Sequence, residues 1–158
     1  KARKESPRKE KEHLLHQKKV GLLGLSKINC CNKIGMRVKL IKSPNSRKKY
    51  RVIFEDGDTV DFGARGYSDF TLHKNPLRMR SYLIRHGASP YISASLKKEK
   101  NPKRVLNGLL NVSNSHLENW KPSGIKTAGF WSRWLIWSVP SMNGAKKLMS
   151  KKFNITFY

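Results

Sequence analysis

The feature that most constrains the fold is a run of alternating apolar and polar residues between positions 35 and 66. Residues 36–42 and 49–54 alternate with the period of a β-strand. The pair Asp56-Gly57 is a strong hairpin signal before a third such stretch, 58–62. The pattern predicts a three-stranded antiparallel meander, which is too thin to be stable alone and must be covered by helices or by another molecule. Its candidate core residues are Tyr50, Val52, Phe54, Val60 and Phe62.

Three helices are predicted after the meander. Asn75 and Pro76 suit the cap and first turn of a helix that ends near Gly87. Residues 129–137 predict a second helix, and Ser141 is placed to cap a third. This order predicts a small α+β fold, in which the meander packs with about three helices and extended basic arms project from the core.

The second predicted helix carries three of the four tryptophans. Trp131, Trp134 and Trp137 recur every three residues, which brings them close together along one side of the helix. Three interpretations stay open: a core beneath the sheet, anchors in a protein interface, or contacts with lipid headgroups. The candidate core or interface aromatics are Trp120, Phe130, Trp131, Trp134 and Trp137.

The chain is strongly basic. Its 158 residues include 34 Lys and Arg against 10 Asp and Glu, a formal charge of +24 with neutral His. Solubility of a small domain needs a net charge of only about 2–8, so the excess indicates a large anionic or acidic partner. Nucleic acid, an anionic membrane face and an acidic protein lattice all fit this criterion.

Two segments concentrate the basic residues, the N-terminal arm 1–19 and the run 97–104. The second lies in a stretch of little pattern whose Ser, Asn and Gly predict an exposed excursion. The predicted organisation is a basic N-terminal arm with a short apolar patch (1–34), the meander and one helix (35–86), the basic excursion (87–117) and the Trp-rich C-terminal helices (118–158). The candidate partner-binding residues are Arg3, Lys4, Arg8, Lys9, Lys97, Lys98, Lys100, Lys103 and Arg104.

No catalytic, cofactor-binding or metal site is predicted, so the chain is not expected to be an enzyme. His73, His86 and His116 lie in separate segments without a nucleophile motif. Cys30 and Cys31 are adjacent, and no second pair completes a zinc site.

Half of all the carboxylates lie between residues 55 and 69. Their irregular spacing does not match a calcium-binding loop, which favours turn formation and local charge compensation. Residues 63–66 are read as a turn rather than as a phosphate cradle, because no Lys-Ser/Thr follows them.

Two long blocks carry a family resemblance. The first reads KYRVIFEDG at 49–57 and VDFGARGYSDFTLHK at 60–74, and the second contains GFWSRWLIW at 129–137. Together they resemble a family of small basic proteins of nucleocytoplasmic large DNA viruses, such as chlorella viruses and mimivirus relatives, over roughly residues 49–86 and 118–150. The resemblance implies a viral origin more firmly than a role, and the excursion 87–117 departs from the family pattern.

These observations predict a minor capsid protein of a large icosahedral DNA virus, whose extended basic segments cement neighbouring capsid proteins. The expected partners are the major and other minor capsid proteins, with viral DNA or the inner membrane surface as further candidates. The expected location is the virion, on the inner face of the capsid, after synthesis in the host cytoplasm. The rival hypothesis is a genome-packaging protein that binds DNA non-specifically through the same Lys and Arg residues.

Overall fold

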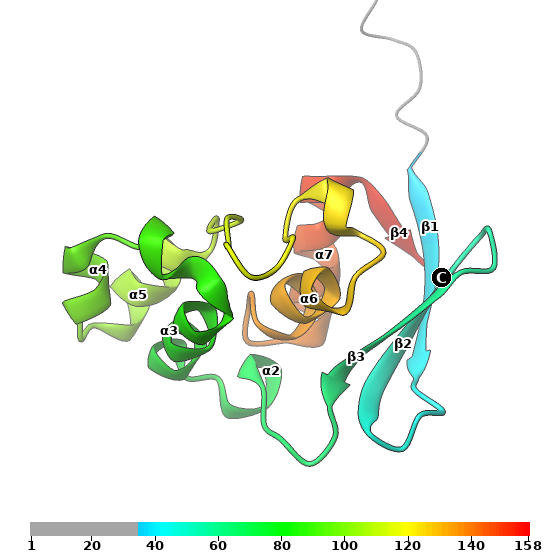
Figure 1. The fold of residues 1–158 in the computed structure, drawn as a ribbon, viewed down its shortest axis with the longest axis horizontal. Coiled ribbons are helices and arrows are strands. Elements are labelled where there is room, and N and C mark those ends of the chain that lie inside the picture. The colour runs from blue at the N-terminus through cyan, green and yellow to red at the C-terminus, as the bar shows by residue number, and fades with distance from the viewer. Residues whose placement is uncertain (1–34) are drawn as a thin grey trace, which may run out of the picture. The chain divides into compact units, whose positions relative to one another are not determined.

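The computed structural model describes residues 35–158 (Figure 1). The predicted N-terminal arm and apolar patch, with Arg3, Lys4, Arg8 and Lys9, lie outside the described residues.

The described residues form a four-stranded mixed sheet with the strand order β3-β2-β1-β4. Three of its strands are the predicted ones, and they pair antiparallel, with Leu40 opposite Val52 and Val52 opposite Val60. The strands are β1 (Met36–Lys42), β2 (Lys48–Phe54), β3 (Thr59–Ala64) and β4 (Ile155–Phe157).

The fourth strand corrects the predicted sheet. β4 pairs parallel to β1, with Met36 opposite Ile155 and Val38 opposite Phe157. The prediction of a three-stranded, purely antiparallel sheet was therefore wrong in strand number and in sheet type. A three-residue strand at the far end of the chain has too little periodicity of its own to reveal such a pairing.

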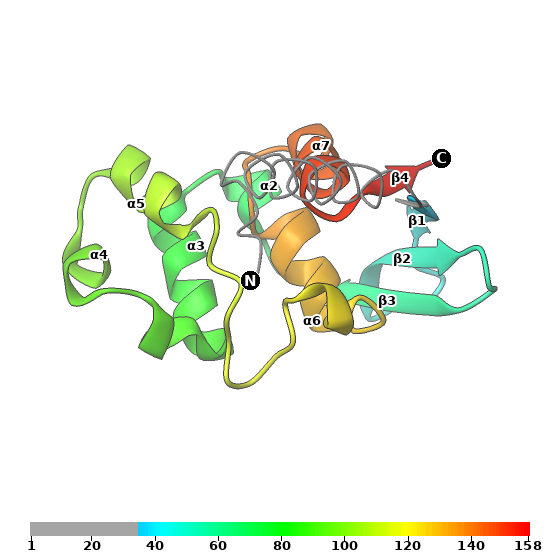
Figure 2. The same cartoon turned by 90° about the horizontal axis from the view of Figure 1, so that it is seen from above.

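Helices fill most of the chain after the sheet, which makes the fold α+β, as the sequence predicts. In Figures 1 and 2, α6 and α7 lie between the sheet and the helices α3, α4 and α5. The helices are α2 (Phe70–His73), α3 (Pro76–Leu83), α4 (Ala94–Lys98), α5 (Pro102–Leu109), α6 (Ala128–Trp131) and α7 (Met142–Phe153). Helical backbone extends α3 through Ile84 and Arg85 to a kink at His86 and Gly87, whose backbone angles are not helical, and a turn of π-helix extends α6 over Ser132–Ile136.

The predicted caps are confirmed. The side chain of Asn75 accepts hydrogen bonds from the backbone N–H groups of Leu77 and Arg78 at the start of α3. Ser141 accepts one from the N–H of Gly144 at the start of α7. At the other end of the extended α3, Gly87 has a φ of +93°, a conformation that residues with a side chain rarely adopt.

The predicted exposed excursion is instead largely helical and packed. Asn101 caps α5 by accepting from Lys103 and Arg104, and Pro102 occupies its first turn. α5 buries Val105 and Leu109, and it packs against α3. The pair Asn101-Pro102 repeats the signal of Asn75-Pro76, so this helix was detectable from sequence.

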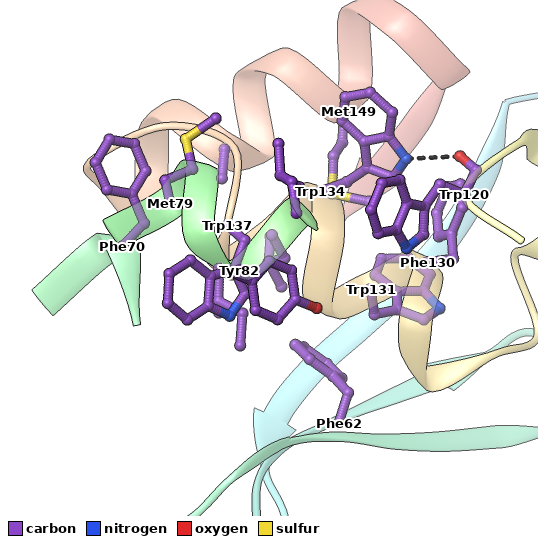
Figure 3. Close-up of a cluster of buried hydrophobic side chains, with 14 of the residues drawn as sticks. Phe62, Phe70, Met79, Tyr82, Trp120, Phe130, Trp131, Trp134, Trp137 and Met149 are labelled. Carbon is purple, nitrogen blue, oxygen red and sulfur yellow. Dashed lines mark hydrogen bonds between the residues drawn. The ribbon is translucent and has the colours of Figure 1, made fainter. Parts of the chain in front are cut away.

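One aromatic core joins the sheet to the helices (Figure 3). The ring centroid of Trp131 lies 5.9 Å from that of Phe54 and 6.3 Å from that of Phe62, so this indole packs on the sheet. The ring of Trp137 stacks on that of Tyr82 from α3, with centroids 4.2 Å apart and an interplanar angle of 2°. None of the helices within residues 35–158 is long and apolar enough to cross a membrane.

Candidate functional site

A polar cleft of about 620 Å³ opens between the end of β3, α3 and the segment that follows α6. Positive side chains reach it from two elements, β2 and the extended α3. Its lining residues are Lys48, Lys49, Gly63, Ala64, Tyr67, Ser68, Asp69, Arg78, Ser81, Tyr82, Arg85, His86, Glu118, Ala128, Ser132, Ile136 and Trp137.

An ion pair between Lys49 and Asp69 lines the cleft. Lys49 Nζ lies 2.6 Å from Asp69 Oδ2, and the two side chains are only 14% and 2% exposed. Asp69 also caps α2, because its other oxygen accepts from the backbone N–H and the hydroxyl of Thr71 at 3.0 and 2.6 Å. The pair is committed to holding α2 on the sheet, so it leaves little net charge for a ligand.

A second pair joins His86 to Glu118, across 32 residues of chain. His86 Nδ1 lies 2.8 Å from Glu118 Oε1, and the indole N–H of Trp120 donates to Glu118 Oε2 at 2.7 Å. Burial by itself raises the pKa of the Glu118 carboxyl, but the hydrogen bonds from His86 and Trp120 outweigh burial and lower it.

The His86 ring also stacks on Tyr82, at a centroid separation of 4.1 Å. Tyr82 therefore lies in a continuous stack between His86 and Trp137. Burial raises the pKa of the Tyr82 hydroxyl, so this phenol stays neutral at physiological pH. The aromatic side of the cleft is consequently fixed by packing rather than by mobile loops.

Three other cations line the cleft without a carboxylate partner among the described residues: Lys48, Arg78 and Arg85. Both arginines are exposed, and Lys48 is half-buried. The cleft thus presents a positive surface beside the Lys49–Asp69 ion pair and the His86–Glu118 contact.

Across residues 35–158, six of the seven Asp and Glu side chains lie within ion-pair distance of a Lys or Arg, and the seventh, Glu118, contacts His86. The same segment has 24 Lys and Arg, of which 18, leaving out the buried Arg133, have no carboxylate partner among the described residues. The pairs are Arg37 with Glu55, Lys126 with Asp56 and Asp58, Arg51 with Asp61, Lys49 with Asp69, Arg104 with Glu99, and His86 with Glu118.

The carboxylate cluster at 55–69 is accordingly used for local charge compensation. The strongest example is Asp61, whose pKa the hydrogen bonds from Arg51 and Ser43 lower to about 2. Within residues 35–158 no group of three or more His, Cys, Asp or Glu is placed to hold a metal ion.

The basic residues at 97–104 were predicted to lie on an extended segment. They lie instead on the short helices α4 and α5 and on the turn between them. Glu99 organises the turn by accepting from the backbone N–H groups of Lys100 and Asn101, each at 2.8 Å. Of the five basic residues in this segment, four are exposed and Lys97 is half-buried. Arg104 pairs with Glu99 at 3.6 Å, and none of these residues lines the cleft. They are Lys97 and Lys98 at the end of α4, Lys100 in the turn, and Lys103 and Arg104 in the first turn of α5.

The candidate aromatics lie in the core. Trp120, Phe130, Trp131 and Trp134 are fully buried, and Trp137, 9% exposed, reaches the cleft. The indole N–H of Trp134 donates to the carbonyl of Trp120 at 2.7 Å, the dashed line in Figure 3. The indole N–H groups of Trp120, Trp131 and Trp134 all donate within the core, so these three buried rings serve packing rather than contact with headgroups or a protein partner.

The cleft was missed by sequence reasoning. Arg78 and Arg85 are seven residues apart, so both lie on one side of a helix, but nothing local shows that Lys48 faces them. That placement depends on how α3 and the sheet pack on the Trp-rich segment between them, α3 on Trp137 and the sheet on Trp131.

Comparison with known proteins gives one match. Residues 38–86 match a family of unknown function, DUF5754. The matched range includes β2, β3, α2 and α3, and it contains 12 of the 17 residues that line the cleft. No curated protein and no solved structure shows a significant similarity to the chain.

Proposed function

We propose that this protein is a minor capsid protein of a large icosahedral DNA virus, which binds acidic surfaces of neighbouring capsid proteins through its basic surface. The observation that carries the proposal is the imbalance of paired charges. Six of the seven carboxylates of residues 35–158 are paired with a Lys or Arg, the seventh contacts His86, and 18 Lys and Arg other than the buried Arg133 have no carboxylate partner.

Unpaired surface cations repel one another and weaken a compact isolated state. An acidic partner removes this repulsion, so association is favoured over the free protein. Individual exposed ion pairs contribute only about 0–1 kcal/mol, which means that binding must use many of them over a large contact area. A particle lattice offers such an area, and the proposed location is the inner face of the capsid.

The position of the aromatic residues supports a partner recognised by charge. Trp and Tyr dominate the energetics of most protein interfaces, but here the tryptophans are buried in the core. Few large apolar side chains of the described residues remain exposed, among them Tyr67, Tyr91 and Leu117. A purified complex should accordingly dissociate as the salt concentration is raised.

The resemblance to proteins of large DNA viruses over 49–86 and 118–150 supports the viral part of the proposal. Both blocks contribute to one core, because Phe54 and Phe62 from the first block pack on Trp131 from the second. The basic turn at 97–104 is added outside the shared blocks, where particle-specific contacts belong.

The test is to locate the protein in purified particles and to map its contacts with a lysine-reactive cross-linker. We expect recovery with the shell after nuclease treatment, and cross-links from Lys98, Lys100 and Lys103 to capsid proteins. Recovery with the genome core alone, and release by nuclease, would instead establish DNA packaging as the role. Binding of the purified chain to duplex DNA, measured against salt concentration, quantifies that alternative.

A further inference from the structure

The cleft beside β3 has the properties of a specific binding site rather than of a merely basic surface. It is concave, and its volume of about 620 Å³ lies within the range of about 300–1,000 Å³ typical of ligand sites. Both carboxylates of the lining already have partners, Asp69 in an ion pair with Lys49 and Glu118 in a contact with His86. The charges that stay available to a ligand are Lys48, Arg78 and Arg85, all of them positive.

The two arginines are suited to oxyanions. Arg78 and Arg85 both line the cleft, and no described carboxylate is within ion-pair distance of either. A guanidinium presents a planar fork of N–H donors that matches the two oxygens of a carboxylate. Ser81 and Ser132 also line the cleft, but the hydroxyl of Ser81 donates to the carbonyl of Leu77 at 3.2 Å, so the arginines are the main donors to an oxyanion.

The strand at the cleft favours a peptide as the ligand. β3 is an edge strand of the described sheet, because it pairs with β2 alone. Its end, Gly63 and Ala64, lines the cleft. An extended peptide can hydrogen-bond to a strand edge while its side chains enter the neighbouring pocket, an interaction that a nucleic acid backbone cannot reproduce.

The opposite side of the cleft is rigid before any ligand arrives. Tyr82 is stacked between His86 and Trp137, and the hydrogen bonds of Glu118 hold the His86 ring. A preformed site loses little conformational entropy on binding, which favours affinity. Tyr67, 75% exposed, lies at the cleft and offers a ring to an apolar part of the ligand.

We propose that this cleft binds an extended acidic segment of a neighbouring protein, with an Asp or Glu carboxylate held by Arg78 and Arg85 beside Lys48. The inference rests on the proposed function, since it locates one contact of the acidic partner. It adds a site at which recognition depends on the sequence of the bound segment and not only on its total charge.

The test measures the affinity of the purified full chain for a short fluorescein-labelled peptide that alternates Glu and Thr. Arg78→Gln/Arg85→Gln is compared with Lys147→Gln/Lys151→Gln, which removes the same charge from exposed positions on α7, outside the cleft. We expect the cleft variant to bind about 10-fold more weakly, and the α7 variant to lose less than about 2-fold. An equal urea midpoint for both variants confirms that neither result reflects unfolding.

Charge reversal supplies a second readout. Arg78→Glu/Arg85→Glu should lose the Glu-Thr peptide and gain a Lys-Thr peptide of the same length. Equal losses in the cleft and α7 variants, or no binding of the acidic peptide, would overturn the proposal. Tighter binding of single-stranded DNA that depends on Arg78 and Arg85 would overturn it in favour of a phosphate site. None of these outcomes bears on recovery of the protein with the capsid shell, which tests the proposed function separately.

Discussion

Arg133 donates from Nη2 to the backbone carbonyl of Leu109 at 2.8 Å, which joins the Trp-rich segment to the C-terminal end of α5. Its guanidinium also donates to the carbonyls of Val112 and Trp137, at 3.1 and 3.0 Å. The side chain is fully buried, and its guanidinium carbon lies 4.4 Å from the ring centroid of Trp134. Burial lowers the pKa of Arg133 to about 9, which still leaves the guanidinium charged at neutral pH.

Removing this guanidinium should destabilise the fold strongly. Arg133→Met leaves several buried carbonyls without a donor, so we expect a loss of about 3 kcal/mol in the free energy of unfolding. Arg133→Lys keeps the charge but not the fork of donors, so its free energy of unfolding should lie between those of Arg133→Met and the wild type. Urea denaturation followed by tryptophan fluorescence measures both. Arg78→Met, at an exposed position, is the control and should change the free energy of unfolding by less than about 0.5 kcal/mol. Equal losses at the two positions would contradict the role of Arg133 as a donor to buried carbonyls.

Two glycines with a similar backbone conformation should respond differently to substitution. Gly87 has a φ of +93° and Gly57 a φ of +87°. A Cβ at Gly87 would lie 2.8 Å from the backbone nitrogen of Leu117, whereas a Cβ at Gly57 meets nothing within 4 Å.

We therefore expect Gly57→Ala to cost about 1 kcal/mol, the usual penalty of a positive φ, and Gly87→Ala to cost more. Thermal and urea unfolding of the two variants measure the difference. Equal losses would show that the loop at 115–117 moves away without a penalty.

The pair formed by Asp61 and Arg51 should make stability depend on acidic pH. The folded-state pKa of Asp61 is lowered from 3.8 to about 2, so the ionised pair stabilises the fold above pH 3.8. This contribution is lost as the pH falls towards 2, where the carboxylate is protonated. The stability gap between the wild type and Asp61→Asn should consequently narrow over this interval.

Urea midpoints at a series of pH values test this dependence. Glu55→Gln is the control, because Glu55 and its partner Arg37 are both more than half exposed and lie 3.5 Å apart. Such a pair contributes little in water. A constant gap for Asp61→Asn from neutral pH to pH 2 would refute the assignment.

Glu118 should couple the end of the extended α3 to the segment that contains Trp120. Glu118→Gln weakens the contact with His86, so we expect a loss of about 1–2 kcal/mol in the free energy of unfolding. Because the pKa of Glu118 is lowered, its contribution is present above the ordinary carboxyl pKa of 4.5 and is lost as the pH falls below it.

A double-mutant cycle of Glu118→Gln with His86→Asn measures this coupling. We expect an interaction energy above about 0.5 kcal/mol, whereas Glu118→Gln with Glu55→Gln should be additive. Additivity in both cycles would show that the 2.8 Å contact contributes nothing to stability.

Sequence alone determined the features that depend on local chemistry. Alternation and the Asp56-Gly57 turn define β1, β2 and β3, and Asn75, Pro76 and Ser141 mark where α3 and α7 begin. These signals are readable because strand periodicity, turn geometry and capping hydrogen bonds involve residues only a few positions apart. The α+β class follows from their order.

Only the tertiary structure decided how distant residues meet. The pairing of β4 with β1 joins Met36 to Ile155, near the opposite end of the chain. The burial of Arg133 is equally non-local, since its acceptors come from Leu109, Leu110 and Val112. The sequence around Arg133 does not show whether its guanidinium is exposed to water or donates hydrogen bonds to buried carbonyls.

The candidate cleft is also a feature that only the tertiary structure decided. Sequence gives the excess of positive charge, but not which cations are already paired, because most carboxylates pair with a residue that folding brings to them from another element. Lys126 lies 2.6 Å from Asp56, across 70 positions of chain. Once these pairs are known, Lys48, Arg78 and Arg85 stand out as the unpaired cations of one cleft. Electrostatic pairing depends on distance in space, and in the cleft that distance is set by the packing of α3 and of the sheet on the Trp-rich segment between them.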